Sequence, residues 1–200
     1  MGSWPAKPWK IYVVSTDGAN LQQLTFGAAN DGDPNWSPKG DVLAFGGEPD
    51  LEGHQSNTGI QVLNLMDGKV SKVPSSEGLY SPRWSPNGRY PAAQSADSTK
   101  LLLYDFEKNK WQNLTQVDAG YFSWSHDGKY IYLTTTGAEA IFARIGTVGE
   151  HTIERLASLK DIRLFNGTFG TWTGIAPDDS LLILRDTSTD EIYSLDVQLP

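Results

Sequence analysis

The chain has no cysteine in its 200 residues. This absence excludes disulfides, thiolate metal sites and a cysteine nucleophile. Histidine is scarce as well: the three are His54, His126 and His151, and none is spaced with another as a pair of metal ligands. Each is interpreted as a solvated loop residue, so the sequence predicts no metal site and no cofactor.

The chain also lacks an excess of basic charge and a long apolar run. It has 16 Lys and Arg against 24 Asp and Glu, for a formal charge of −8, and the basic residues are scattered. A nucleic-acid partner and an anionic membrane surface are therefore disfavoured. No segment approaches the roughly 20 apolar residues of a membrane span, and the N-terminus lacks a signal-peptide core. We expect no membrane insertion by this chain.

Turn formers and large aromatic residues are abundant instead. The chain has 20 Gly, 11 Pro and 7 Trp, which indicate many tight turns and large packing anchors. This composition is typical of all-β architecture.

A short motif ending in Trp-Ser-Pro-x-Gly recurs, and an apolar strand follows each copy. The copies occupy 33–40, 81–88 and 121–128, and a decayed fourth copy lies at 173–179. Their turns begin at Ser37, Ser85, Ser125 and Ala176, which are 48, 40 and 51 residues apart. Because a blade of four short strands takes roughly 40–50 residues, this spacing predicts propeller blades.

Each copy also has a strand–turn–strand half, with hairpin signals such as Asp17-Gly18 and Asp67-Gly68. We predict an all-β fold, a β-propeller of four-stranded antiparallel blades, with about four to five blades in this chain. It forms one domain over residues 9–200, behind a tail at 1–8. The repeats are predicted near 9–50, 59–97, 100–137, 140–186 and 191–197.

The conspicuous residues of the motif are interpreted as structural. Pro presets φ and Gly takes the positive φ of the turn, while Trp packs between neighbouring blades. The fourth copy departs from the pattern, with Ile175 for Trp and Asp179 for Gly, and His126 replaces Pro in the third. The structural positions are Trp36, Pro38, Gly40, Trp84, Pro86, Gly88, Trp124, Asp127 and Gly128.

This order of motif, apolar strand, Asp-Gly turn and Leu-Thr ending resembles the TolB-like, WD40-like propeller repeat over residues 9–197. The resemblance implies a bacterial protein and favours a periplasmic or other extracytoplasmic location. Such propellers usually have about six blades or more. We therefore expect the C-terminal part of a larger propeller. The alternatives are a small closed ring of about four blades, in which N-terminal strands complete the last blade, and self-association with a second copy.

Two stretches are longer than a connection between neighbouring strands needs to be. Long loops often carry function. The acidic loop 46–59 contributes the candidates Glu48, Asp50 and Glu52. The aromatic-rich insertion 159–172 contributes Arg163, Phe165, Asn166, Phe169 and Trp172.

No phosphate loop, nucleophile elbow or zincin motif occurs in the sequence. The sequence thus predicts a chain that is not an enzyme, a scaffold module that binds a protein or peptide partner. Two alternatives stay open: the gating propeller of a prolyl-oligopeptidase-type serine peptidase, and a carbohydrate-binding propeller.

Overall fold

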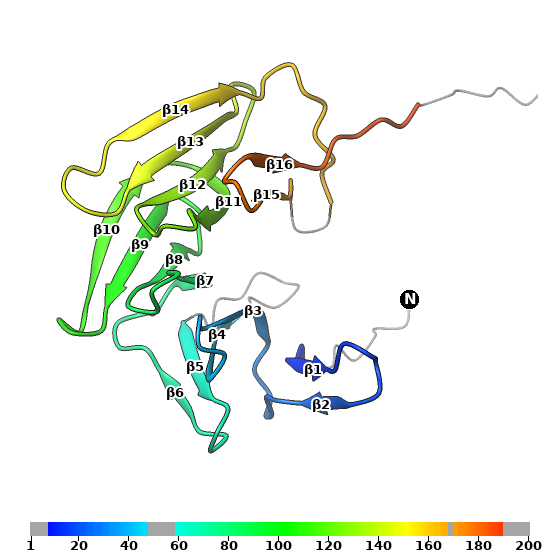
Figure 1. Ribbon diagram of the computed structural model, residues 1–200, viewed down its shortest axis with the longest axis vertical. Coiled ribbons are helices and arrows are strands. Elements are labelled where there is room, and N and C mark those ends of the chain that lie inside the picture. Colours follow the sequence, from blue (N-terminus) through cyan, green and yellow to red (C-terminus); the bar gives the residue numbers. More distant parts are fainter. Residues whose placement is uncertain (1–7, 48–58, 168–169, 190–200) are drawn as a thin grey trace, which may run out of the picture.

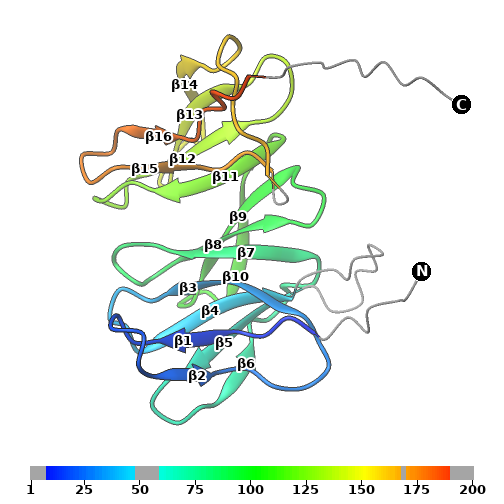
Figure 2. The ribbon, with the colours of Figure 1, turned by 90° about the vertical axis from the view of Figure 1, so that its right-hand side faces the viewer.

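The structure is a computed structural model that describes residues 8–47, 59–167 and 170–189. Their sixteen strands form five antiparallel sheets, arranged as successive blades along an arc (Figures 1 and 2). None of these residues lies in a helix, so the described part of the chain contains no helix that could cross a membrane. The all-β prediction with four-stranded antiparallel blades is confirmed.

Three sheets are complete blades, and a two-stranded hairpin lies at each end of the arc. The N-terminal hairpin is β1 (Tyr12–Val14) with β2 (Leu21–Gln23). Blade I is β3 (Asp31–Trp36), β4 (Val42–Gly47), β5 (Ile60–Asn64) and β6 (Val70–Lys72). Blade II is β7 (Leu79–Trp84), β8 (Pro91–Ser95), β9 (Lys100–Asp105) and β10 (Lys110–Gln116). Blade III is β11 (Ala119–Trp124), β12 (Tyr130–Thr135), β13 (Ile141–Gly146) and β14 (Ile153–Ser158). The C-terminal hairpin is β15 (Thr173–Ile175) with β16 (Leu181–Ile183).

The apolar core is divided among the junctions between these units. Ile11 of the N-terminal segment packs with Leu43 and Phe45 of blade I. Clusters of the same kind join blade I to blade II and blade II to blade III. At the last junction, Tyr132 of blade III packs against Leu181 of the C-terminal hairpin. The alternation of apolar residues along each strand therefore buries one blade against the next rather than forming one central core.

The serine of each Trp-Ser turn closes the turn with its side chain. The Ser85 hydroxyl accepts a hydrogen bond from the Tyr90 amide at 2.9 Å, and Ser125 accepts one from Tyr130 at 3.0 Å. The turn glycines lie in the left-handed region, with φ of 72° at Gly88 and 70° at Gly128. The two turns thus share one geometry, which hydrogen bonds to the backbone and the positive φ of glycine produce, as the turn interpretation requires.

The described strands form an arc that does not close on itself. The hairpins β1–β2 and β15–β16 are separate sheets, and they lie apart at the open side of the arc in Figure 1. Among the described residues, the closed four-blade ring, in which N-terminal strands would complete the last blade, is therefore not formed.

Candidate functional site

A cavity of about 930 Å³ lies where the innermost strands of the blades converge. Its wall combines the starts of β3, β7 and β11 with the end of β12 and the loop that follows β14. The lining residues used below are Asp33, Tyr80, Ser81, Gln94, Ser98, Tyr121, Thr134, Ala138 and Asn166. Pockets of a few hundred to about 1,000 Å³ are typical of ligand sites, so this axial cavity is the candidate site.

Bulges in the first strand of each blade shape the cavity wall. The strand register shifts between Gly32 and Asn35 in β3, between Tyr80 and Arg83 in β7, and between Ala119 and Phe122 in β11. At two of these bulges the non-glycine residues Asp33 and Ser81 have φ of 50° and 53°. Backbone positions of this strained kind cluster at functional sites. Bulges next to such sites change the direction in which side chains point.

One ion pair neutralises the carboxylate that lines the cavity. The Arg83 Nη2 lies 2.9 Å from the Asp33 Oδ1, and its guanidinium also lies over the Phe122 ring, 5.9 Å from the centroid. Arg83 thereby connects blade I to blade III across blade II. The cavity is left with little net charge on this side.

The rest of the wall combines hydroxyl and amide groups with apolar side chains such as Leu159, Ile162 and Leu164. The Tyr80 hydroxyl and the Ser98 hydroxyl are 2.7 Å apart, and the Thr134 and Thr173 hydroxyls are 3.3 Å apart. The buried Gln94 amide donates to the carbonyl of Ala119 at the bulge of the next blade. Hydroxyls both donate and accept hydrogen bonds, so this wall suits a neutral ligand that has both polar and apolar groups.

The structure places one predicted binding residue, Asn166, on the cavity wall. Arg163 is instead paired with Asp186 at 3.0 Å and donates to the Ser188 carbonyl at 3.1 Å. Phe165 and Trp172 are half-exposed. The candidates Phe169, Glu48, Asp50 and Glu52 lie outside the described residues. A binding role for each of these residues stays a prediction.

Two of the histidines have defined neighbours, and His54 lies outside the described residues. The His151 Nδ1 donates to the Gly146 carbonyl at 2.9 Å, and its Nε2 lies 2.7 Å from the Gln112 amide nitrogen. The His126 ring pairs with Asp179. No group of three or more His, Cys, Asp or Glu residues in the described part of the chain could hold a metal ion.

The repeat tryptophans take three different environments. The Trp124 Nε1–H donates to the Arg83 carbonyl of the preceding blade at 2.9 Å. Trp84 stacks on Phe106 of its own blade, with centroids 5.6 Å apart. Trp36, at the open N-terminal end, is 49% exposed. Of these three indoles, only that of Trp124 donates a hydrogen bond to the preceding blade, and the Trp84 Nε1 is buried without a hydrogen-bond partner among the described residues.

Sequence reasoning identified the insertion 159–172, part of which lines the cavity, but it missed the wall formed by the inner strands. Tyr80 and Ser81, like Gly120 and Tyr121, lie four and three residues before the motif tryptophan, respectively. Because that tryptophan ends the innermost strand, this fixed offset is the signal that marks the axial positions.

Comparison with known proteins gives a modest sequence match. No protein-family model matches the chain. It is 29% identical over 139 residues to the uncharacterized peptidase YuxL of Bacillus subtilis (strain 168), a match that covers 69% of this chain and 20% of YuxL. The chain thus spans about a fifth of the length of this relative.

Solved structures match over more of the chain. TolB from Acinetobacter baumannii superposes with a TM-score of 0.66 at 18% identity, covering 92% of this chain and 45% of TolB. An acylaminoacyl peptidase from Pyrococcus horikoshii superposes with a TM-score of 0.52 at 19% identity, covering 64% of this chain and 25% of the peptidase. The chain is a TolB-like β-propeller in fold.

The comparisons correct one expectation from sequence. The prediction that the chain is not an enzyme is wrong, because the sequence relative is named as a peptidase and an acylaminoacyl peptidase is among the structural neighbours. The absence of catalytic motifs misled because the chain spans only about a fifth of this relative, so catalytic motifs elsewhere in the relative have no counterpart in it.

Proposed function

We propose that the chain is the propeller module of a serine-peptidase-type protein, and that its axial cavity receives an extended peptide segment. The cavity, whose wall combines hydroxyl and amide groups with apolar side chains, carries this proposal. The 29% identity to a protein named as a peptidase supports it. The gating propeller, an alternative from the sequence, thereby becomes the preferred function.

The chemistry of the wall fits a peptide backbone. A backbone presents alternating N–H donors and C=O acceptors. Hydroxyls such as those of Ser98 and Thr134 can accept a hydrogen bond from the first and donate one to the second. The Asp33 charge is already satisfied by Arg83. A neutral backbone therefore suits this wall better than a strongly charged ligand does, since a charge would enter without an opposite free charge among these groups.

Peptide binding can be measured with an array of synthetic octapeptides, followed by calorimetry on the best binder. Ala138 lines the cavity and is exposed, so Ala138→Trp fills part of the space without disturbing the core. We expect its affinity to fall roughly tenfold or more, a loss of about 1.4 kcal/mol. Val148, 88% exposed in the loop between β13 and β14, gives the matched control Val148→Trp, with unchanged affinity. Equal affinities for the two variants would count against the cavity as the site.

The peptidase assignment has a separate test. An antibody raised against this chain would capture the native polypeptide from cells, and a fluorophosphonate probe would label an activated serine. We expect a labelled polypeptide longer than 200 residues. A captured polypeptide that the probe does not label would contradict the assignment.

Docking of a folded protein partner is the second candidate. The fit to TolB over 92% of the chain supports this candidate. In the labelling experiment, a captured polypeptide that the probe does not label and that copurifies with one partner would favour docking over the peptidase assignment. An extracytoplasmic location stays a prediction under either function.

A further inference from the structure

A buried glutamine presents an unpaired hydrogen-bond acceptor at the cavity. The Gln94 side chain lines the cavity, and the residue is only 4% exposed. Its Nε2 donates to the backbone carbonyls of Ala119 and, at 3.3 Å, of Gly120. These two carbonyls fix which end of the amide faces blade III, because only the nitrogen can donate to them. The Oε1 is left as an acceptor, and no group in the described part of the chain donates to it.

The Gln94 Oε1 is open to the cavity rather than enclosed by protein. Among the described residues, the Trp84 Nε1 is the single fully enclosed side-chain polar atom without a partner. The unpartnered Oε1 therefore keeps accessible surface, and the cavity is the space that its side chain lines. An acceptor held in place on a buried side chain is suited to a ligand N–H.

A glycine keeps the wall beside Gln94 open. A Cβ at Gly120 would lie 3.1 Å from the Thr134 Oγ1 and 3.4 Å from the Thr134 carbonyl oxygen. The φ of Gly120 is not positive, so the missing side chain serves space rather than backbone conformation. The cavity thus continues from Gln94 of blade II past Gly120 to the end of β12 in blade III.

An apolar shelf continues the wall from the end of β12. It consists of Ala138, Ala140, Leu159, Ile162 and Leu164. The Leu159 amide donates to the Ala140 carbonyl at 2.8 Å, and the Ile162 amide donates to the Leu159 carbonyl at 3.0 Å. Ala140, Ile162 and Leu164 pack on the core cluster around Tyr132 and are only partly buried. Their remaining surface therefore offers a ligand an apolar contact that the core holds in place.

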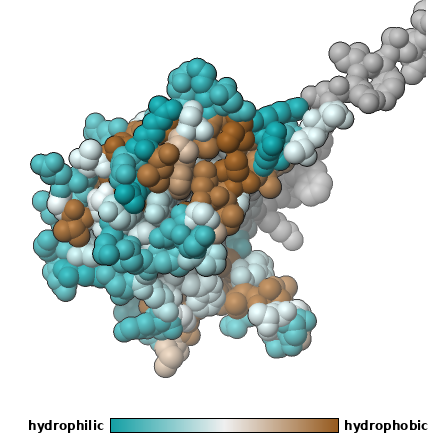
Figure 3. All heavy atoms as spheres, turned by 45° about the horizontal axis from the view of Figure 1, so that its top comes forward, coloured by the Kyte–Doolittle hydropathy of each residue, from teal (hydrophilic) through white to brown (hydrophobic). Residues whose placement is uncertain are grey.

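Apolar residues are not confined to the shelf at this end of the molecule. Figure 3 shows that they (brown) also gather on the surface formed by blade III and the C-terminal hairpin. The hydroxyl-bearing residues Tyr80 and Ser98 of the cavity wall lie instead on blade II. The cavity therefore has a polar side and an apolar side.

The charges that line the cavity are paired. Asp33 and Lys160 are the charged residues on its wall in the described part of the chain. Asp33 pairs with Arg83 at 2.9 Å, and the Lys160 Nζ lies 2.6 Å from the Glu139 Oε1. A charged ligand side chain would lose hydration here without meeting a free opposite charge.

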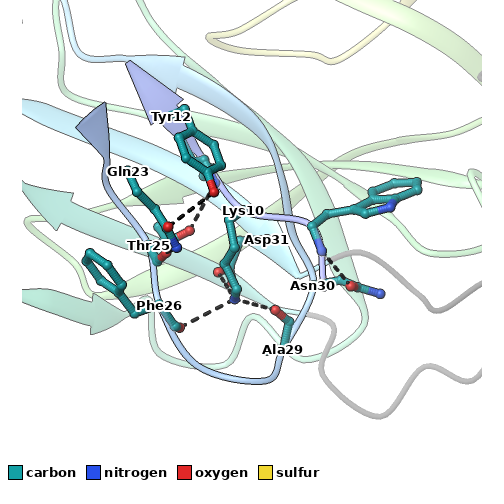
Figure 4. Close-up of polar contacts among 10 residues, drawn as sticks. Lys10, Tyr12, Gln23, Thr25, Phe26, Ala29, Asn30 and Asp31 are labelled. Atoms are coloured by element: carbon teal, nitrogen blue, oxygen red, sulfur yellow. Dashed lines mark hydrogen bonds and ion pairs between the residues drawn. The ribbon is translucent and has the colours of Figure 1, made fainter. Parts of the chain in front are cut away.

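One further ion pair adjoins the wall, beside the lining residue Trp9. The Lys10 Nζ lies 2.7 Å from the Asp31 Oδ2, and both side chains are buried. The same ammonium donates to the carbonyls of Ala29 and Phe26 (Figure 4). This charge is therefore satisfied within the protein and attracts no charged ligand.

We propose that the apolar shelf and the Gln94 Oε1 form a specificity pocket for a bulky apolar side chain, such as that of leucine or phenylalanine. The shelf contacts the side chain, and the Gln94 Oε1 accepts a backbone N–H of the same peptide segment. This inference rests on the proposed peptide binding and adds to it the class of segment that binds. Burial of a leucine-sized side chain favours binding by roughly tenfold or more.

A position scan of the bound peptide tests the side-chain preference. Each position of the tightest octapeptide from the array is replaced in turn by Gly, Leu, Phe, Lys or Asp, and calorimetry gives the affinity for the whole chain. We expect one position at which Leu or Phe binds roughly tenfold more tightly than Gly. Lys and Asp should bind there no better than Gly.

Ile162→Thr places a hydroxyl on the apolar shelf and keeps a β-branched side chain. It should reduce the preference for Leu over Gly to roughly threefold or less. Val148, 88% exposed in the loop between β13 and β14, gives the matched control Val148→Thr, which should keep the full preference. Thermal melts of both variants show that they are folded.

Methylation of the peptide nitrogens, one amide at a time, tests the Gln94 acceptor without altering the protein. We expect methylation of one amide to weaken binding roughly threefold to tenfold, because it removes the N–H that the Oε1 accepts. Gln94→Met removes the acceptor and keeps the length of the side chain. It should weaken binding of the unmethylated peptide by a similar factor and abolish most of the effect of that methyl group.

The outcomes separate this pocket from the proposed function. If no octapeptide binds, the proposed function and the pocket are both overturned. If octapeptides bind but Gly, Leu and Lys are equivalent at every position, peptide binding stands and the pocket is overturned. The pocket is also overturned by a preference for Leu that Ile162→Thr leaves intact, or by affinities that no methylated amide lowers.

Discussion

The junction between blades II and III differs from the junction between blade III and the C-terminal hairpin in three side chains. At the first, Pro86 lies against Gly128 and Trp124 bonds back to blade II. At the second, His126 stands in the proline position and Asp179 in the glycine position, and Ile175 replaces the tryptophan. The His126 amide donates to the Asp179 carboxylate at 3.1 Å, and the ring pairs with the same oxygen.

His126 and Asp179 look in the sequence like two unrelated departures from the motif. In the structure they form one interacting pair that replaces the proline and the glycine together. A van der Waals contact between turns has been exchanged for a hydrogen-bonded pair. The turn itself is preserved, since Asp179 has a φ of 63° and donates to the Ala176 carbonyl at 2.9 Å. Aspartate tolerates the left-handed region better than most residues, so this exchange costs little in the backbone.

Trp124→Ala should produce the largest loss, because it opens the regular junction. The indole is buried and its N–H bond crosses to blade II. We expect a fall of about 3–5 kcal/mol in the free energy of unfolding. Urea denaturation measures it. Trp36→Ala is the matched control, since the same residue in the same motif is 49% exposed and should cost only about 1 kcal/mol. Equal losses would contradict the difference between a covered and an open junction.

The paired replacement at the last junction predicts non-additive mutations. His126→Pro leaves the Asp179 carboxylate without its partner, and Asp179→Gly leaves the His126 ring and amide without theirs. The double change restores the contact of the other junctions. We expect a coupling of roughly 0.5–1 kcal/mol in the free energy of unfolding from a double-mutant cycle.

The converse exchange is the control for that cycle. Pro86→His combined with Gly128→Asp should be better tolerated than either change alone, because it transplants the pair to the regular junction. Additive effects at both junctions would mean that the observed pairing contributes no stability.

The fold was readable from the sequence because its determinants are local. The turn residues near Ser85 and Ser125 direct the backbone by themselves, and their spacing gives the blade period. The pairing of His126 with Asp179 was not readable, since these residues are far apart in the chain and only the stacking of successive turns brings them together. Lys10 and Asp31 form a buried ion pair that was equally unreadable, since the packing of the N-terminal segment on blade I brings them together.

The candidate site was harder to predict because it belongs to no single repeat. The long insertion drew attention to Arg163 and Phe165, and it does line the cavity through other residues such as Leu159 and Leu164, but the inner strands of the three complete blades form a wall that no loop signal marks. The bulges that carry Asp33 and Ser81 into the wall have no strong sequence signal beyond the prolines that follow them. Only the convergence of blades turns these ordinary residues into one surface.

The turns at the regular junction supply the smallest predicted effect, a dependence on acid pH. The Lys129 amide, with the Lys129 ammonium and the Ser125 hydroxyl, lowers the pKa of Asp127 to about 2, below its ordinary value of 3.8. The unfolded chain therefore binds a proton at higher pH than the folded chain. This group's stabilisation is fully present above the ordinary value and is lost as the pH falls toward about 2.

Blade II provides a natural control for that titration, because Asn87 occupies the position of Asp127. Its amide oxygen accepts from the Ser85 hydroxyl at 2.8 Å and from the Arg89 amide at 3.0 Å, without a titrating group. Asp127→Asn should therefore keep the turn and flatten the dependence of the unfolding free energy on pH between about 4 and 2. Asn87→Asp should steepen it. Urea titrations at several pH values in that window measure both slopes, and an unchanged slope in Asp127→Asn would show that the carboxylate is not stabilised by its turn.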